Sequence, residues 1–447
     1  MIVLKFGGTS VQDAEAIARA ADIVRSRLDR QPLVVVSALA GVTNELIAIA
    51  EQAGSGQLIG ALSGVETLRA RHLTECDTLL SGDDCDDIRS ELSAMFDHLA
   101  SLAEALSVLG FLTPRSQDVI VATGEQLSAQ LVVAAFRAND LPAEHVDARQ
   151  VVITDEQFTK AVPNEERIEE AAREALLPLV QAGAVPVMGG FIGSSITGLT
   201  TTLGRGGSDF SAALVGAALD AEAIEIWTDV DGMLTADPRV VEGARLIEQI
   251  RFEEAAELAS FGAKVLHPST IAPAVRRGIP VFIYNSRRPD GRGTLIAAEA
   301  PRRPVSAIAG KGDVTIVKVR SSRMLLQHGF LRTLFDVFER HTTSVDVVAT
   351  SEVSVSVTVD DPSRLEGLVI DLMALGDVSI ERNRAIIAIV GAALGGHSQT
   401  MARALAALGD IPVHMISLSA TQINLTLIVD GEQLGPAMRA LHNAFFT

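Results

Sequence analysis

Short apolar runs alternate with longer amphipathic stretches over roughly the first two thirds of the chain. The runs IVLKF, PLVVVS, VPVMGGF and AIEIWTD predict buried strands, and between them apolar residues recur at helical spacing, as in residues 14–28 and 44–51. Strands that alternate with helices are typical of a mostly parallel sheet with helices on both faces. Residues 67–109 show a helical pattern without a strand candidate, so the sequence predicts an α/β domain with a helical elaboration.

A different pattern begins after residues 287–304, a segment rich in Pro, Gly and Arg that predicts a connection between domains. Two βαββαβ units follow in tandem. The first has strands predicted at 315–319, 344–350, 353–359 and 378–382, and helices at 331–341 and 363–375. The second has strands at 385–390, 413–418 and 422–429, and helices at 398–408 and 432–444. It lacks a fourth strand, which residues 305–309 would supply by interlocking the two units.

Composition narrows the class of protein. A chain of 447 residues predicts two or three domains. Although 48% of the residues are hydrophobic, we find no continuous apolar run of membrane-spanning length and no leader sequence, so we expect a soluble cytoplasmic protein without a membrane partner. The net charge of −19 disfavours nucleic acid as a partner. Cys76 and Cys85 lack a histidine in ligand spacing, and we predict neither a disulfide framework nor a metal site built from protein ligands.

The motif KFGGTSV, residues 5–11, has the composition of an anion-binding loop. Lys5 ends an apolar run, and glycines and hydroxyl residues stand where a helix would begin. Glycines let backbone N–H groups approach a phosphate, and a helix N-terminus adds partial positive charge. The lysine precedes the glycines, so this is not a Walker sequence. We therefore predict a phosphate-binding loop of another kind.

Three further patches combine glycine with charge near strand ends. TGEQLS places Glu125 at the predicted start of a helix, where a carboxylate can simply complement the helix dipole. TTTLGRGGSDFSAA places Arg205 between glycines before a helix, which suits an anionic ligand, although Ser208 and Asp209 can be ordinary caps. WTDVDGMLTADPR and FGAKVLHP mix carboxylates with Arg239 and Lys264, a set that suits nucleotide phosphates but also ordinary turns.

Together these motifs resemble the amino-acid kinase family, and within it the aspartokinases. The resemblance covers KFGGTSV, the SA and GVTN segments, GE, GRGGSD, WTDVDG, ADPR and FGAKVLHP in this order, and continues into a C-terminal pair of ACT domains. It implies a catalytic domain at residues 1–296 and ACT domains at 313–383 and 384–447, the second completed by strand 305–310. SVDVVATSEVSVSVTV is most similar to the lysine-sensitive bacterial type.

The implied activity is phosphorylation of the β-carboxylate of L-aspartate by ATP with Mg²⁺. The residues implied in catalysis are Lys5 and Asp209. Those implied in ATP binding are Lys5, Gly7, Gly8, Thr9, Thr228, Asp229, Leu234, Arg239, Lys264 and Val265. Those implied in aspartate binding are Ser37, Thr43, Glu125, Arg205, Gly206, Gly207 and Ser208. Arg205 would pair with the α-carboxylate and Glu125 with the α-ammonium group.

Regulation by an amino acid is implied through the first ACT domain. The effector positions are Met324, Gln327, Phe330, Leu331, Asp346, Ser351 and Glu352, with lysine the first choice of effector and threonine the second. The resemblance and the readiness of ACT sheet edges to pair predict a homodimer through these domains, or a tetramer.

Two departures and two alternatives accompany this interpretation. Leu234 stands where such enzymes often have tyrosine, and Gln327 stands where a serine is expected. Met324, Phe330 and Leu331 would also pack a core without any effector. The alternatives are an amino-acid kinase that acts on another small acid, such as glutamate, and a non-catalytic amino-acid sensor.

Overall fold

The computed structural model describes residues 1–262, 266, 268–325, 327–392, 394–396 and 398–447. The chain forms two compact units. The first unit comprises Met1–Met233 and Val265–Ala300, and the second comprises Leu234–Lys264 and Pro301–Thr447. The second unit therefore includes a segment that the sequence pattern alone places in the catalytic domain.

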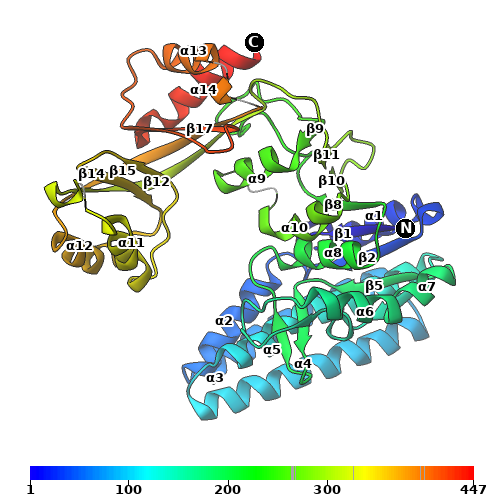
Figure 1. Cartoon of the computed structure of the whole chain (residues 1–447). Coiled ribbons are helices and arrows are strands. Elements are labelled where there is room, and N and C mark those ends of the chain that lie inside the picture. Colours follow the sequence, from blue (N-terminus) through cyan, green and yellow to red (C-terminus); the bar gives the residue numbers. More distant parts are fainter. Residues whose placement is uncertain (263–265, 267, 326, 393, 397) are drawn as a thin grey trace. The chain divides into compact units, whose positions relative to one another are not determined.

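The first unit is built on a mostly parallel sheet, in the order β3-β5-β2-β1-β8-β10-β11 (Figure 1). Its strands are β1 (Ile2–Phe6), β2 (Pro32–Val36), β3 (Ala143–Val146), β5 (Val185–Gly189), β8 (Ala223–Thr228), β10 (Val281–Asn285) and β11 (Thr294–Ala297). β10 and β11 are antiparallel, whereas the pairs from β3 to β10 are parallel. A small second sheet has the order β4-β6-β7, with β4 (Ile153–Thr154), β6 (Ile192–Ser195) and β7 (Thr200–Thr202).

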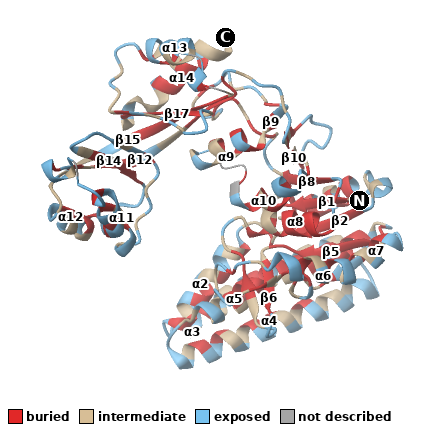
Figure 2. Ribbon diagram, in the orientation of Figure 1, coloured by how far each residue is buried: buried red, intermediate tan, exposed pale blue. Residues whose placement is uncertain are grey.

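Helices pack around this sheet. They are α1 (Ala14–Arg25), α2 (Val42–Gly54), α3 (Leu58–Leu79), α4 (Asp83–Leu109), α5 (Pro114–Ala138), α6 (Glu165–Ala175), α7 (Leu177–Gln181), α8 (Gly207–Ala218) and α10 (Ala272–Arg277). Side chains alternate along a strand. Ile2, Leu4 and Phe6 of β1 accordingly join the core that contains α1 and α5, while Lys5 points to the other face, toward α8. Figure 2 shows the strands of this sheet as the buried centre of the unit.

Two helices, α4 and α5, are long and apolar enough to cross a membrane by composition alone. In α5, 78% of the most apolar window is buried inside the protein. The corresponding share for α4 is 28%, but its stripe of Leu92, Phe96 and Leu99 belongs to the same core cluster. Packing within the unit thus accounts for the apolar character of α5 and for one apolar stripe of α4. Cys76 is buried, Cys85 is partly buried, and both are free thiols.

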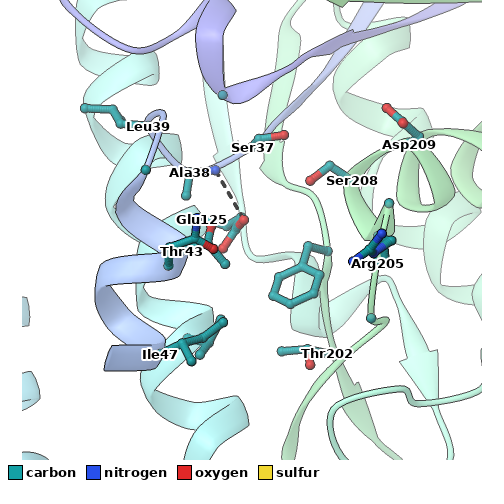
Figure 3. Close-up of a pocket in the computed structure, with 18 of the residues that line it drawn as sticks. Ser37, Ala38, Leu39, Thr43, Ile47, Glu125, Thr202, Arg205, Ser208 and Asp209 are labelled. Atoms are coloured by element: carbon teal, nitrogen blue, oxygen red, sulfur yellow. Dashed lines mark hydrogen bonds between the residues drawn. The ribbon is translucent and has the colours of Figure 1, made fainter. Parts of the chain in front are cut away.

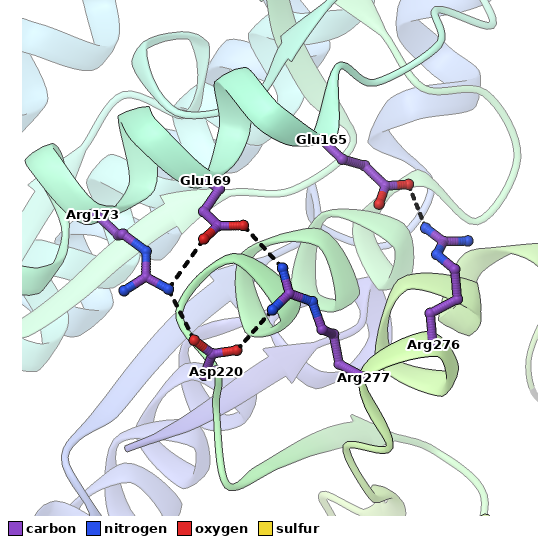
Figure 4. A network of polar contacts seen from close by, with 6 residues as sticks. All are labelled: Glu165, Glu169, Arg173, Asp220, Arg276 and Arg277. Carbon is purple, nitrogen blue, oxygen red and sulfur yellow. Dashed lines mark hydrogen bonds and ion pairs between the residues drawn. The ribbon is translucent and has the colours of Figure 1, made fainter.

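Ion pairs join α6, the turn after α8, and α10 at the surface (Figure 4). Arg173 and Arg277 each contact both Glu169 and Asp220, at 2.9 to 3.3 Å, and Arg276 contacts Glu165. Each of these side chains is between 39% and 58% exposed, so solvent weakens every pair. The network links α10 to α6 and to the turn after α8, the helix whose first turn carries Ser208 and Asp209.

The second unit contains a continuous sheet in the order β13-β14-β12-β15-β17-β16. Its strands are β12 (Ala307–Arg320), β13 (Val348–Thr350), β14 (Ser354–Val359), β15 (Asp377–Val390), β16 (Met415–Leu418) and β17 (Asn424–Asp430). Its helices are α11 (Phe330–Arg340), α12 (Leu365–Met373), α13 (Ser398–Leu408) and α14 (Leu434–Phe446). The segment from Leu234 adds β9 (Gln249–Arg251) and α9 (Phe252–Ser260).

Two long strands interlock the βαββαβ repeats. The first part of β12, Ala307 to Lys311, pairs with Ile386 to Val390 of β15, while Val314 to Arg320 pairs with Asp377 to Arg384. The second repeat thus receives a strand from the segment that enters the unit. The sequence pattern predicted separate strands on either side of residues 310–314 and 383–384, but each pair is one strand with a bulge in its pairing near Lys311 to Ile316. Short polar interruptions do not end a strand whose backbone stays paired.

Two boundaries differ from the sequence prediction. The predicted connection at residues 287–304 contains β11, whose residues Thr294 to Ile296 pair with β10. The predicted strand at 344–350 contains only the three-residue β13. Gly and Arg residues next to Thr294 are not typical of a strand, so the sequence pattern did not predict β11. Asp346 interrupts the apolar run before β13, so the strand begins later than predicted.

Candidate functional site

The KFGGTSV loop leaves the carboxyl end of β1, a central strand of the sheet. The Gly7 N–H donates to the Trp227 carbonyl at 2.9 Å, and the Ser10 hydroxyl donates to the same oxygen at 3.1 Å. At Gly8 an added Cβ would lie 2.9 Å from the Ala38 carbonyl oxygen, closer than a side chain tolerates. The second glycine is therefore required where the loop passes the end of β2.

The first turn of α8 faces this loop. Gly206 precedes the helix with φ 72°, a left-handed conformation that glycine adopts without steric cost. Lys5 is 8% exposed, and its Nζ lies 2.7 Å from Asp209 Oδ1 in that first turn. The Arg205 side chain is exposed beside them, and no described residue forms a hydrogen bond or ion pair with its guanidinium. Lys5 is thus held in place, whereas Arg205 is free to receive an anion.

Glu125 lies in the middle of α5, so the predicted position at the start of a helix is wrong. The helix begins after Thr113, whose hydroxyl caps it, with Pro114 in the first turn. Gly124 suggested a helix start, but its role is close packing: an added Cβ would lie 3.0 Å from Ala38 Cβ and from Leu46 Cδ1. The missing side chain lets α5 approach the β2–α2 connection and α2, and this brings Glu125 to the end of β2.

The carboxyl group of Glu125 is buried with one oxygen unpaired. Oε1 accepts a hydrogen bond from the Ala38 N–H at 3.2 Å, while Oε2 has no partner among the described residues. The residue is 3% exposed, and burial raises the pKa of Glu125 to about 8, because a charged carboxylate is poorly solvated there. A buried acceptor without a donor is costly, so this position suits a ligand that brings a positive donor.

A single cavity of about 540 Å³ unites these groups. Figure 3 shows Thr43 and Glu125 on one side of it and Arg205, Ser208 and Asp209 on the other. Ten predicted residues line the cavity: Lys5, Gly8, Ser37, Thr43, Glu125, Arg205, Gly206, Gly207, Ser208 and Asp209. A carboxylate, a guanidinium and an ammonium therefore face one space. That combination suits a small zwitterion together with an anion.

Among the lining residues that the sequence analysis did not predict, three have unusual surroundings or backbone conformations: Asp118, Thr159 and Phe191. Asp118 is 1% exposed and accepts from the Thr159 N–H and from both the N–H and the hydroxyl of Thr202, at 2.7 to 3.0 Å. It holds β7, which leads into the Arg205 loop. Thr159 and Phe191 have φ of 70° and 65°, a region that non-glycine residues rarely adopt and that is often found at functional sites. A lone aspartate on a helix and two loop residues carry no pattern that sequence could reveal.

The predicted nucleotide residues beyond the KFGGTSV loop fall into three groups. Thr228, at the end of β8, and Asp229 belong to the first unit, and the Thr228 carbonyl accepts from the Ser286 N–H at 2.8 Å. Leu234 and Arg239 belong to the second unit, where Arg239 is paired with Asp237 through its Nε at 3.0 Å and its Nη2 at 2.7 Å. This pair lowers the pKa of Asp237. Lys264 and Val265 lie outside the described residues.

The predicted effector residues lie on two segments of the first repeat. Met324 ends the 3-10 helix η5 (Ser322–Met324) and packs on the core that buries Phe330, while Gln327 and Leu331 are exposed. The others lie around β13: Asp346 precedes it, and Ser351 and Glu352 follow it. Within the described chain, no hydrogen bond or ion pair joins Asp346 to the other six.

Asp346 instead has partners on β12 and just beyond β14. Lys311 Nζ lies 3.5 Å from its Oδ2 and also pairs with Asp360. Burial and the adjacent Asp360 carboxyl raise the pKa of Asp346, and Lys311 offsets part of this. Two carboxyl groups thus share one ammonium group.

Comparison with known proteins identifies the family. The amino acid kinase family profile matches residues 1–285, and an ACT domain profile matches residues 387–445. Lysine-sensitive aspartokinase 3 of Escherichia coli is 39% identical over 100% of this chain and 99% of its own length. The chain belongs to the aspartokinases.

Other aspartokinases extend the likeness. Aspartokinase 3, chloroplastic, of Arabidopsis thaliana is 36% identical over 99% of this chain and 81% of its own length. The crystal structure of E. coli aspartokinase III in complex with aspartate and ADP (R-state) has a TM-score of 0.87 with this chain at 38% identity, covering 100% of both. The structure of the same enzyme with lysine and aspartate (T-state) has a TM-score of 0.85, with the same identity and coverage. The predicted fold class, amino-acid kinase followed by ACT domains, is confirmed.

The buried carboxyl of this aspartokinase makes stability depend on pH. Because the pKa of Glu125 is raised from 4.5 to about 8, the folded chain binds more protons than the unfolded chain between these values. The protonated carboxyl therefore contributes stability below about pH 4.5, and this contribution is lost as the pH rises through about 8. Thermal unfolding of wild type and Glu125→Gln without ligands should show the variant gaining relative stability from pH 5 to pH 8. A difference that is constant over this range would contradict the assignment.

Proposed function

We propose that the protein is an aspartate kinase, which transfers the γ-phosphoryl group of ATP to the β-carboxylate of L-aspartate. The observation that carries the proposal is the cavity in which Glu125, Arg205 and Lys5 face one space. A buried carboxyl with one unpaired oxygen and an unpaired guanidinium complement the two charges that every amino acid carries at its α-carbon. The products are 4-phospho-L-aspartate and ADP, and the reaction would open the pathway to aspartate-derived amino acids.

Aspartate is held by its α-groups so that its β-carboxylate remains free to react. Arg205 binds the α-carboxylate through two parallel hydrogen bonds, which the guanidinium geometry favours. Glu125 binds the α-ammonium group, which supplies the donor that its buried Oε2 lacks. The neighbouring lining residues complete the aspartate site: Ser37, Thr43, Gly206, Gly207 and Ser208.

The chemical step needs positive charge more than it needs a base. The β-carboxylate is ionised at neutral pH, so one of its oxygens can attack the γ-phosphorus while the bond to the ADP oxygen breaks. Lys5 stabilises the charge on the transferred phosphoryl group, assisted by N–H groups of Gly8 and Thr9. The Gly7 N–H, which was predicted to assist, instead donates to the Trp227 carbonyl at 2.9 Å. Asp209 orients Lys5 through the 2.7 Å ion pair. It is acceptor-only in this role and removes no proton.

ATP binding extends beyond this cavity to Thr228, Asp229, Leu234, Arg239, Lys264 and Val265. Mg²⁺ would accompany ATP and would supply positive charge to its phosphates. No group of three or more His, Cys, Asp or Glu side chains converges as metal ligands among the described residues. The phosphate oxygens and water would therefore provide most of the ligands, as Mg²⁺ prefers.

A coupled assay of ADP release over the common amino acids tests this function. Release with L-aspartate and none with glutamate is the expected result. Release with another acid in place of aspartate would favour an amino-acid kinase of different specificity, and ATP binding without any release would favour a sensor.

Replacing Lys5 with alanine should reduce kcat by about 10²-fold to 10⁴-fold, the range for loss of one preorganised electrostatic contact. The KM for aspartate should change little, because Lys5 acts on the phosphoryl group. Steady-state kinetics with both substrates measure this, and a thermal melt of the variant checks folding. A variant that keeps a third of wild-type turnover would rule out the assignment.

Replacing Arg205 with alanine should instead raise the KM for aspartate at least tenfold, which corresponds to about 1.4 kcal/mol of binding energy. Arg205→Lys is the matched variant, since it keeps the charge but loses the second parallel hydrogen bond, and should fall between wild type and Arg205→Ala. An unchanged KM for aspartate with a raised KM for ATP would show that Arg205 binds ATP and not aspartate.

We also infer the domain boundaries and the regulatory site. The catalytic domain is assigned to residues 1–296, and the ACT domains to 313–383 and 384–447, with strand 305–310 part of the second. The effector site lies in the first ACT domain and takes lysine, with threonine as the second choice. The excess of carboxylate over ammonium at Asp346 supports a cationic ligand, because an added ammonium group would balance the cluster. The remaining effector residues are Met324, Gln327, Phe330, Leu331, Ser351 and Glu352.

The protein acts as a cytoplasmic homodimer joined through the first ACT domains, or as a tetramer of such dimers. Support comes from β13, a short strand at the edge of the sheet, which leaves backbone groups available for a second copy. Val348 on β13 and the nearby Val353 are 38% and 37% exposed, which gives the edge an apolar margin.

Replacing Asp346 with asparagine should weaken inhibition by lysine tenfold or more and leave the uninhibited kcat nearly unchanged. An effector inhibits only by binding the inactive state better than the active state. Asp346 would contact the effector but neither ATP nor aspartate, so its replacement should not change the uninhibited kcat. Inhibition titrations of both proteins measure the effect. An unchanged curve, or no inhibition of wild type by millimolar lysine or threonine, would reject the effector site while the kinase assignment stands.

A further inference from the structure

Thr235 forms hydrogen bonds through its N–H, hydroxyl and carbonyl groups, and it lies at the start of the segment that carries Leu234 and Arg239. Its N–H donates to the Arg245 carbonyl at 2.9 Å, and its hydroxyl oxygen accepts from the Arg245 N–H at 2.9 Å. Its own carbonyl accepts from the N–H of Ile308, in the first part of β12, at 2.8 Å. The side chain is 6% exposed. This residue therefore fixes the segment to the strand that completes the second ACT domain.

His442 makes the fourth contact, from the last helix of the chain. Its Nε2 lies 2.9 Å from the Thr235 hydroxyl, and both groups are buried. The Thr235 oxygen already accepts from Arg245, so its hydrogen is available to be donated to a neutral imidazole. Burial lowers the pKa of His442 and favours that neutral form. The ring also stacks on Phe446, with centroids 4.7 Å apart, so helix α14 holds its orientation.

The rest of the segment shares the core of the second ACT domain. Ala236 and Val241 belong to the cluster that contains Ile387, Leu425 and Leu441. Helix α9 is attached to the same domain by two polar contacts. Glu254 accepts from the Ser306 hydroxyl at 2.8 Å, and Glu257 accepts from the Asn424 amide at 2.7 Å. Residues 234–260 are thus held against the second ACT domain by packing and by hydrogen bonds.

We propose that His442 is a positioning residue for ATP binding, because its hydrogen bond to Thr235 holds the segment Leu234 to Arg239 on the last helix of the second ACT domain. The inference rests on the proposed function only in assigning ATP to this segment. Aspartate binding uses none of these residues.

The test measures the dissociation constant for ATP by calorimetry without aspartate, together with both KM values. His442→Phe and Thr235→Val should each raise the Kd and the KM for ATP about fivefold or more, with the KM for aspartate within twofold of wild type. His442→Gln can place its amide near the position of Nε2 and should recover ATP binding to within twofold of wild type. The double variant should be no worse than either single variant, because both remove one hydrogen bond.

Thr358→Val is the matched control. Thr358 is also fully buried, and its hydroxyl accepts a backbone N–H, from Val347 at 2.9 Å, but it lies in the first ACT domain. It should leave ATP binding unchanged. Unchanged ATP binding in His442→Phe, an equal loss in Thr358→Val, or a parallel rise of both KM values would each overturn the proposal. Wild type that binds ATP but leaves aspartate unphosphorylated would refute the proposed function, and the ATP Kd series would still decide the role of His442.

Discussion

The ion pair between Lys5 and Asp209 joins the two elements on which the pocket depends. Lys5 ends the central strand β1 and points to the α8 face because side chains alternate along the strand, and Asp209 lies in the first turn of α8. This contact brings the glycine loop and the Arg205 loop to the same cavity. A largely buried ammonium is costly without a partner, so the pair both fixes geometry and keeps the charge in place. Glu125 lies on the other side of the cavity, where a ligand ammonium group would favour its charged form.

Regulation depends on a second constraint, the sharing of strands between repeats. Because β12 and β15 each serve both ACT domains, neither domain can move as an independent body within the unit. Thr235 connects to the first part of β12 through Ile308 and to α14 through His442. The segment that bears Leu234 and Arg239 is therefore coupled to the shared strands.

The order of the motifs and the spacing of apolar residues identified the fold class, because glycine loops and strand periodicity are local properties of sequence. The same motifs name Lys5 and Asp209, which the structure joins in an ion pair. What escaped prediction depends on tertiary contacts. Gly124 suggested a helix start but serves close packing of α5, Asp118 is recognisable only by its donors, and β12 and β15 are continuous because their partners continue. The sequence also did not predict the ion pair between Arg239 and Asp237, although it indicated a turn at these residues.

The most direct test of the account is the identity of the phosphorylated carboxyl group. If Arg205 and Glu125 hold the α-groups, only the β-carboxylate can reach the phosphoryl group beside Lys5. Incubation with ATP and L-aspartate, trapping of the acyl phosphate with hydroxylamine and NMR of the product should give the β-hydroxamate. The α-hydroxamate, or ADP release without any hydroxamate, would contradict the orientation on which this account rests.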